Sequence, residues 1–215
     1  MSRGNQFAYV VEYSALDFIL FLEGVIPMNF SNNVTVSGLI HHLSKKKQSY
    51  FPFSIRHENL WLDGSMRKDF LTARAFSKDL QEKLSRLEEN TPVNVKGILR
   101  SSKGSGELFL DVSEVETLPE ISDPVNIVKL SGAVHIIKAK NEGENGTGKY
   151  TRFAVRQEDS ENGRDFIVVR VYDDDNNVMR GILAGKNDND PVTVEGTLRS
   201  SRGSGVNYVR CGKLE

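Results

Sequence analysis

The sequence is poor in cysteine, in excess charge of either sign and in long apolar runs. Its single cysteine, Cys211, excludes an intrachain disulfide framework and a zinc site built from several cysteines. Lysine and arginine number 28 against 29 acidic residues, so any attraction of nucleic acid requires cations sorted onto one face. The most apolar stretch, 15–27, is too short to span a bilayer, and no signal peptide is evident. These absences predict a cytoplasmic protein without a membrane segment.

The chain repeats itself internally. PVNVKGILRSSKGSG at 92–106 and PVTVEGTLRSSRGSG at 191–205 are identical at 11 of 15 positions. Two further segment pairs occur upstream in the same order. They are 34–43 with 128–137, and 69–76 with 165–172. A chain of 215 residues does not produce such agreement by chance, so a unit has been duplicated.

We predict the two copies at 31–118 and 125–215, joined by an acidic, proline-containing linker at 119–124. Residues 1–30 match neither copy. This N-terminal extension could form a docking strand, a helix or a cover over an exposed edge, and the sequence leaves its role open.

Hydrophobic periodicity predicts five strands in each copy, with a short helix between the third and the fourth. The expected strands are 34–44, 49–57, 68–76, 92–100 and 107–117, then 126–138, 149–157, 165–172, 191–199 and 205–213. The helices are expected at about 78–89, with Ser77 as N-cap, and at about 176–184.

This order of elements is that of an OB-fold barrel. The paired mid-strand glycines Gly38 and Gly132, and Gly97 and Gly196, allow the sharp bends that a small closed barrel needs. We therefore predict an all-β protein with short helices, built as two tandem five-stranded OB-fold barrels.

The third strand of each copy carries a repeated row of aromatic residues around an arginine. Alternation puts the apolar residues of these strands on the core face. The opposite faces are expected to carry Phe70, Thr72, Arg74 and Phe76, and Phe166, Val168, Arg170 and Tyr172. Rings can stack on any base, and arginine can neutralise phosphate or stack as a planar cation, so this row suits single-stranded nucleic acid.

Further rings and cations are expected beside this row. They are Tyr50, Arg56, Trp61, Tyr150, Arg152 and Arg156 around the second strands, Arg100, Lys103, Arg199 and Arg202 around the glycine-rich hairpins, and Lys45–Lys47 in a loop. The hairpin cations could wrap a bound strand. Packing is an equal alternative for Trp61, as is simple solvation for the lysine run.

The second copy resembles the bacterial single-stranded DNA-binding protein family. The resemblance rests on N-x-V-x-L-x-G at 126–132, RDFIVVRVY at 164–172 and PVTVEGTLR at 191–199, and the first copy matches more loosely. It implies base stacking at both ends of the third strand, on Phe70, Phe76, Phe166 and Tyr172. It also implies nucleic-acid contacts from the hairpin cations Arg100, Lys103, Arg199 and Arg202.

The chain departs from that family in two ways. Family members commonly carry an acidic C-terminal tail that recruits replication and repair partners, whereas this sequence ends at Glu215 after the last expected strand. We therefore expect no recruitment by such a tail. The usual member has one fold per chain and assembles four, so a homodimer of this chain would supply four barrels.

Several features of the sequence allow other interpretations. The aromatic row could be a second core face or a protein interface. The P-loop-like segment 143–150 has tyrosine where serine or threonine would hold magnesium, and it precedes a strand instead of a helix. Asp173–Asp175 suit a solvated turn. His41, His42, His57 and His135 show no metal-site spacing.

We therefore predict a non-enzymatic, largely sequence-independent single-stranded DNA-binding protein of replication, repair or recombination. It is expected to be nucleoid-associated and to need neither cofactor nor metal. The alternative is a protein-interaction module, such as an adaptor in a primosome-like assembly. RNA is a further possible ligand, because a stacking row does not sense the 2′-hydroxyl.

Overall fold

The computed structural model describes residues 30–44, 49–60, 64–136, 142–145, 148–159, 163–172 and 178–215. The first half contains β1 (Ser31–Leu43), β2 (Phe51–Leu60), β3 (Met66–Ala75), α2 (Lys78–Ser85), β4 (Pro92–Ser101) and β5 (Leu108–Thr117). The second half contains β6 (Asn126–His135), β7 (Glu142–Asn145), β8 (Gly148–Asp159), β9 (Gly163–Tyr172), α3 (Val178–Ala184), β10 (Pro191–Ser200) and β11 (Asn207–Leu214). The predicted order of strands and helices is confirmed in the first half, and the second half follows it with one additional strand, β7.

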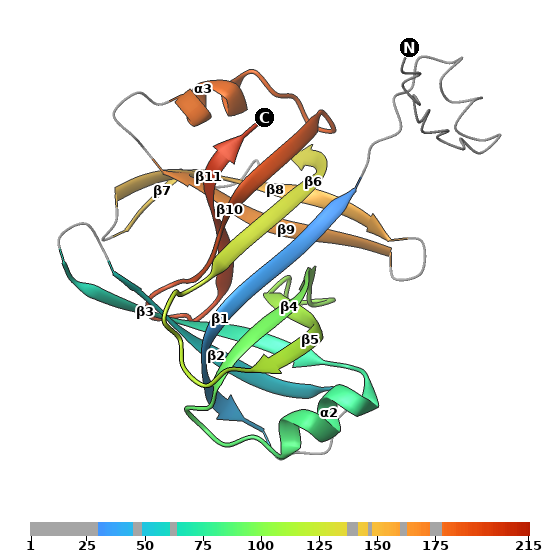
Figure 1. The fold of residues 1–215 in the computed structure, drawn as a ribbon. Helices are drawn as coiled ribbons and strands as arrows, with labels where there is room; N and C mark the ends of the chain where they lie inside the picture. The colour runs from blue at the N-terminus through green and yellow to red at the C-terminus, as the bar shows by residue number, and fades with distance from the viewer. Residues whose placement is uncertain are drawn as a thin grey trace, which may run out of the picture.

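Each half closes into an OB-fold barrel (Figure 1). In barrel one the strands are paired in the order β1, β2, β3, β5, β4 and back to β1, with β3 and β5 parallel. Barrel two repeats this circuit with β6, β8, β9, β11 and β10. The short strand β7, which the sequence did not predict, pairs with the outer edge of β8. The predicted fold class is confirmed.

Strand alternation builds the two cores as the sequence predicted. Leu71, Ala73 and Ala75 of β3 are fully buried, as are the inward residues of β9, Ile167, Val169 and Val171. These side chains join the valines and leucines of the other strands in a continuous buried cluster. The opposite faces of β3 and β9 therefore point away from the core.

Two glycines bring strands into close contact at the barrel corners. Gly97 and Gly196 each sit at a shift in register, between β4 and β5 and between β10 and β11. A Cβ atom at either position would lie 2.1 Å from a carbonyl oxygen, that of Asp111 or Arg210. The tight bend predicted at these positions thus depends on the missing side chain.

The helices are short and lie outside the strands. Ser77 caps α2, since its hydroxyl accepts a hydrogen bond from the Leu80 N–H at 3.2 Å. The helix ends about one turn before the predicted residue 89, because the N–H groups of Arg86 and Leu87 bond to carbonyls three residues back. No helix among the described residues is long and apolar enough to cross a membrane.

The barrels are joined edge to edge into one 11-stranded sheet. Strands β1 and β6 lie side by side and antiparallel, in a register that runs from the Ser31–Ser131 pair to Val36–Asn126 (Figure 1). The Gln157 amide adds hydrogen bonds to the carbonyls of both Ser31 and Ser131, at 3.0 and 2.7 Å. The first strands of the two copies thus connect the barrels through their backbones.

Two buried carboxylates form a second connection, with approximate twofold symmetry. Asp69 of barrel one accepts a hydrogen bond from the Ser200 N–H at 3.0 Å and forms an ion pair with Arg199. Asp165 of barrel two likewise accepts from the Ser101 N–H at 2.7 Å and forms an ion pair with Arg100 at 3.4 Å. Each carboxylate therefore holds the start of the hairpin of the other barrel.

Candidate nucleic-acid interface

The outer face of β3 carries the row that the sequence predicted for barrel one. Phe70 and Phe76 are 39% and 43% exposed, Thr72 is exposed, and Arg74 is half-buried between them. Burial alternates strictly along β3, so the pleat directs these side chains away from the core. Two large rings with open faces therefore lie on one surface of barrel one.

The corresponding row in barrel two is less exposed. Phe166, Val168 and Arg170 are half-buried on the outer face of β9, whereas Tyr172 is only 6% exposed. The Tyr172 hydroxyl lies 3.3 Å from the hydroxyl of Tyr208, and the Arg210 guanidinium lies 5.0 Å from its ring centroid. The interpretation of Tyr172 as an open stacking platform is wrong, because β11 covers its ring.

In each barrel the central arginine lies between two rings. Arg74 is 4.9 Å from the ring centroid of Tyr50 and 4.0 Å from that of Phe109. Arg170 takes the same place at 4.7 Å from Tyr150 and 3.8 Å from Tyr208. Such cation–π contacts fix the orientation of both partners. The central arginine therefore fixes the positions of the rings on both sides of it.

Phe109 and Tyr208 were missed by the sequence reasoning. Both are buried residues of the fifth strand in their barrel, outside the strands on which the sequence placed the aromatic row. A signal for them exists in the repeat, because each follows the first arginine of its hairpin segment, Arg100 or Arg199, by nine positions. Burial and hydrogen bonding to Tyr172 also raise the pKa of the Tyr208 hydroxyl, which therefore stays neutral.

Two histidines extend the ring surfaces. His41 at the end of β1 lies 4.5 Å from Phe70 between ring centroids, and His135 at the end of β6 lies 5.0 Å from Phe166. His135 also approaches Asp188, with 3.3 Å between Nδ1 and Oδ1. The N–H of Ile136 donates to Asp188 and is the main reason that the pKa of this carboxyl is lowered. The sequence predicted only that these histidines lack metal-site spacing, and it gave no sign that they lie beside the rings.

The second strands supply half-buried cations beside these rings. Arg56 forms an ion pair with Glu58 at 3.1 Å, and Arg156 forms the equivalent pair with Glu158 at 3.3 Å. Arg152 is also half-buried on β8. All three lie on the outer side of their strand, as predicted, but the glutamates partly compensate Arg56 and Arg156.

Two of the four hairpin cations do not project to solvent. Arg199 is 5% exposed and lies 2.8 Å from Asp69, an ion pair that is not aligned as a hydrogen bond. Arg100 lies between Asp165 and Asp111, at 3.4 and 3.7 Å. Carboxylates on the partner barrel and the neighbouring strand pair with both guanidinium groups, so the structure places these two cations at the junction of the barrels, and their contact with nucleic acid stays a prediction.

Burial has opposite effects on the two kinds of group in these ion pairs. It is the main cause of a lowered pKa at Arg199 and of a raised pKa at Asp111. The opposite charge beside each group works against that shift. These ion pairs therefore help to join the two barrels. Of the four hairpin cations, Lys103 and Arg202 are the two at exposed hairpin tips.

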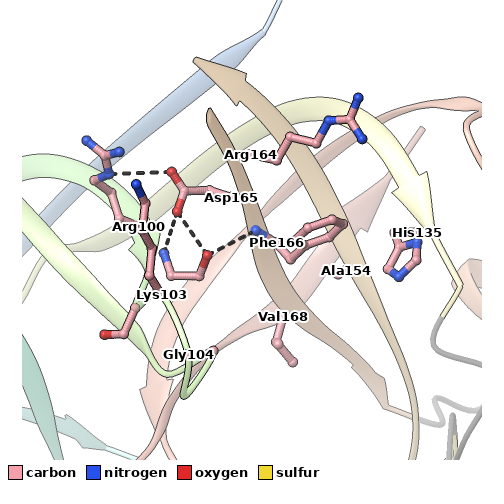
Figure 2. Close-up of a pocket in the computed structure, with 12 residues that line it drawn as sticks. Arg100, Lys103, Gly104, His135, Ala154, Arg164, Asp165, Phe166 and Val168 are labelled. Atoms are coloured by element: carbon pink, nitrogen blue, oxygen red, sulfur yellow. Dashed lines mark hydrogen bonds and ion pairs between the residues drawn. The ribbon is translucent and has the colours of Figure 1, made fainter. Parts of the chain in front are cut away.

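Each hairpin lies against the ring row of the other barrel. The tip of the first hairpin, Lys103–Gly106, and Phe166 line one pocket of about 460 Å³ (Figure 2). The tip of the second, around Gly205, lines a smaller pocket of about 100 Å³ with Arg74 and Phe109. The surface around each row is therefore composite, which the sequence did not predict.

Some predicted features lie outside the described residues. These are Trp61, Lys45–Lys47, Asp173–Asp175 and nearly all of the N-terminal extension 1–30.

Comparison with known proteins shows the fold. The chain is similar to the wild-type single-stranded DNA binding protein from Thermus aquaticus, with a TM-score of 0.66 and 15% identity over 86% of this chain and 92% of that chain. It is similar to a deletion mutant of the same protein at a TM-score of 0.65 and 16% identity, over 86% of this chain and 94% of that one. No family model and no curated protein matches the sequence.

Proposed function

We propose that the protein binds single-stranded DNA with little sequence preference. The observation that carries this proposal is the pair of matched ring rows. Both barrels keep a phenylalanine at the same place on the third strand, Phe70 and Phe166, beside a histidine and a ring-held arginine. The fold shared with the Thermus aquaticus protein supports the proposal.

Base stacking is the interaction that suits these surfaces. An aromatic platform contributes ~1–3 kcal/mol per stacked base and accepts every base, because each base has a π-face. Phe70 and Phe76 offer the most open rings, while Phe166 and Tyr150 are half-buried and present part of theirs. The proposed path of the strand runs over β2 and β3 in barrel one, and over β8 and β9 in barrel two.

Cations beside the rings would bind the phosphates. Lys103 and Arg202 are exposed at the hairpin tips, and Arg152, Arg156 and Arg56 border the rows. Each phosphate contact on a single strand lowers the logarithm of affinity by ~0.7 per tenfold rise in salt. The net charge of −1 predicts a shallow salt dependence and weak binding to duplex DNA.

We propose a cellular role and an oligomeric state from the same observations. A protein of this kind would coat and protect single strands in replication, repair or recombination in the cytoplasm, without catalysis. A homodimer would bring four barrels together. We propose that the two domains span residues 31–118 and 125–215.

A titration with labelled oligo-dT, a duplex and an RNA of equal length tests the proposal. We expect fluorescence anisotropy to rise with oligo-dT, with a much weaker response to the duplex. Absence of binding to oligo-dT at low salt would refute the proposal and favour a protein-interaction module. Equal affinity for RNA would widen the ligand class to single-stranded nucleic acid in general.

A further inference from the structure

A buried position near the end of β2 holds a histidine where the same strand of barrel two has a glutamine. These residues are His57 and Gln157, and both are buried. The Gln157 amide donates to two backbone carbonyls, those of Ser31 and Ser131. Its hydrogen bonds do not depend on pH, because an amide does not titrate. A histidine at the equivalent position introduces a group that does titrate.

His57 meets an oxygen atom on each side of its ring. Its Nδ1 lies 2.7 Å from the carbonyl oxygen of Ser37, and its Nε2 lies 2.9 Å from Oδ1 of Asn59. The other contact of Asn59 sets the orientation of this amide, because its NH₂ group donates to the Asp69 carboxylate at 3.4 Å. Turned over, the amide would direct its oxygen at that carboxylate. A neutral imidazole has one N–H, so only the doubly protonated ring donates to both oxygens.

The charged groups that face this contact lie on β3 and β10. Asp69 is directly opposite His57 in the register of β2 and β3, and it is fully buried. Arg67 of β3 and Arg199 of β10 approach the same carboxylate, at 3.7 and 2.8 Å. A proton on His57 therefore enters a buried network of one carboxylate and two guanidinium groups.

The network continues from Asp69 to the aromatic row of barrel one. Asp69 accepts hydrogen bonds from the N–H and the hydroxyl of Ser200, at 3.0 and 3.3 Å. The Ser200 hydroxyl in turn accepts from the N–H of Phe70 at 3.1 Å. Ser200 is the last residue of β10, just before the second hairpin. A change at Asn59 therefore reaches the second hairpin and the backbone of Phe70 through two further residues.

We propose that His57 is a proton-sensitive switch that couples barrel one to the second hairpin. When both ring nitrogens carry a proton, the imidazole bridges β1 and Asn59, and the Asn59 amide stays bonded to Asp69. When the ring loses a proton, Nε2 turns a lone pair toward Asn59. The Asn59 amide then rotates to offer its NH₂ group to the ring and releases Asp69.

The coupling does not depend on the proposed function, because every contact in it lies within the chain. Histidine is the side chain that ordinarily changes charge between about pH 5 and 8, so this is the range to titrate. Barrel two serves as an internal comparison, since Gln157 holds the same place there without a titrating group.

An NMR titration of the full chain across this range tests the switch. The ring ¹⁵N resonances of His57 report its protonation, the side-chain NH₂ signals of Asn59 report the amide, and the Ser200 N–H reports the hairpin. We expect all three to shift with one common midpoint. His57→Gln, which installs the residue of barrel two, should abolish the shifts at Asn59 and Ser200. His42→Gln, at an exposed position on β1, is the matched control and should preserve them.

A second variant separates the ring from the carboxylate. In Asn59→Ala, His57 should still titrate, while the Ser200 N–H should no longer follow it. This variant keeps the test decisive if His57→Gln does not fold. The switch is refuted if His57 keeps one protonation state across the range, or if the Ser200 N–H stays in place while His57 titrates. It is also refuted if the Ser200 N–H shifts alike in the wild type and in either variant.

Discussion

Removing the Asp69 carboxylate should destabilise the protein strongly. Asp69 is fully buried and holds three groups of the second hairpin segment, namely the Ser200 N–H, the Ser200 hydroxyl and the Arg199 guanidinium. Asp69→Ala leaves Arg199 buried without this carboxylate, and the Ser200 N–H without its acceptor. Breaking a buried ion pair on one side costs about 3–5 kcal/mol. That is a large part of a typical free energy of unfolding of ~5–15 kcal/mol.

The symmetric partner gives a graded comparison. Asp165 is 12% exposed and its arginine, Arg100, is 19% exposed and shared with Asp111. Because water reaches this pair and a second carboxylate remains, Asp165→Ala should cost less than Asp69→Ala. The exposed linker residue Asp123, changed to alanine, is the control and should shift the free energy of unfolding by less than ~0.5 kcal/mol.

Urea denaturation at neutral pH measures these differences. Circular dichroism and tryptophan fluorescence are followed together, because coincident curves are needed for a two-state free energy. A cost for Asp69→Ala of under 1 kcal/mol, or one equal to that of Asp165→Ala, would refute the account of the junction.

Three further predictions concern the rings, the glycine bends and the thiol. Phe70→Ala should weaken oligo-dT binding by ~1–3 kcal/mol with an unchanged salt slope, whereas Lys103→Ala should reduce the slope by ~0.7 unit; equal slopes in an anisotropy titration would contradict this division. Gly97→Ala should lower the free energy of unfolding in urea by ~1–3 kcal/mol or more, because the new Cβ atom collides with the Asp111 carbonyl. The control is Gly181→Ala in α3, where a Cβ atom meets nothing within 4 Å, and it should leave this free energy unchanged or raise it by up to ~1 kcal/mol. Burial raises the pKa of Cys211 to about 12, so iodoacetamide at pH 8 should label it only in urea; rapid labelling of the folded protein would contradict its burial.

The fold was predictable because its signals are local and occur twice. The apolar alternation of DFLTARAF and DFIVVRVY assigned the core faces of β3 and β9 before any contact was known. The bends at Gly97 and Gly196 followed from glycine in mid-strand. By contrast, β7 lies in a polar loop, where no alternation marks a strand.

The candidate site was predictable only in part, because its remaining features depend on contacts between the copies. Arg100 and Arg199 occur in basic, glycine-rich hairpin segments, and nothing nearby in the sequence shows that they form ion pairs with Asp165 and Asp69 of the other barrel. The exposure of Tyr172 depends on Tyr208 from another strand. Each pocket combines a hairpin of one barrel with the third strand of the other, and no local pattern in the sequence predicts that crossing.

Photo-crosslinking tests the central claim most directly. The protein is irradiated with an oligo-dT that carries 5-iododeoxyuridine, and the crosslinked residues are identified by mass spectrometry. We expect crosslinks at the rings of both rows, chiefly Phe70, Phe76, Phe166 and Tyr150. Crosslinks confined to α2, α3 or the outer face of β1 and β6, with both rows untouched, would contradict the claim that these rings bind the bases.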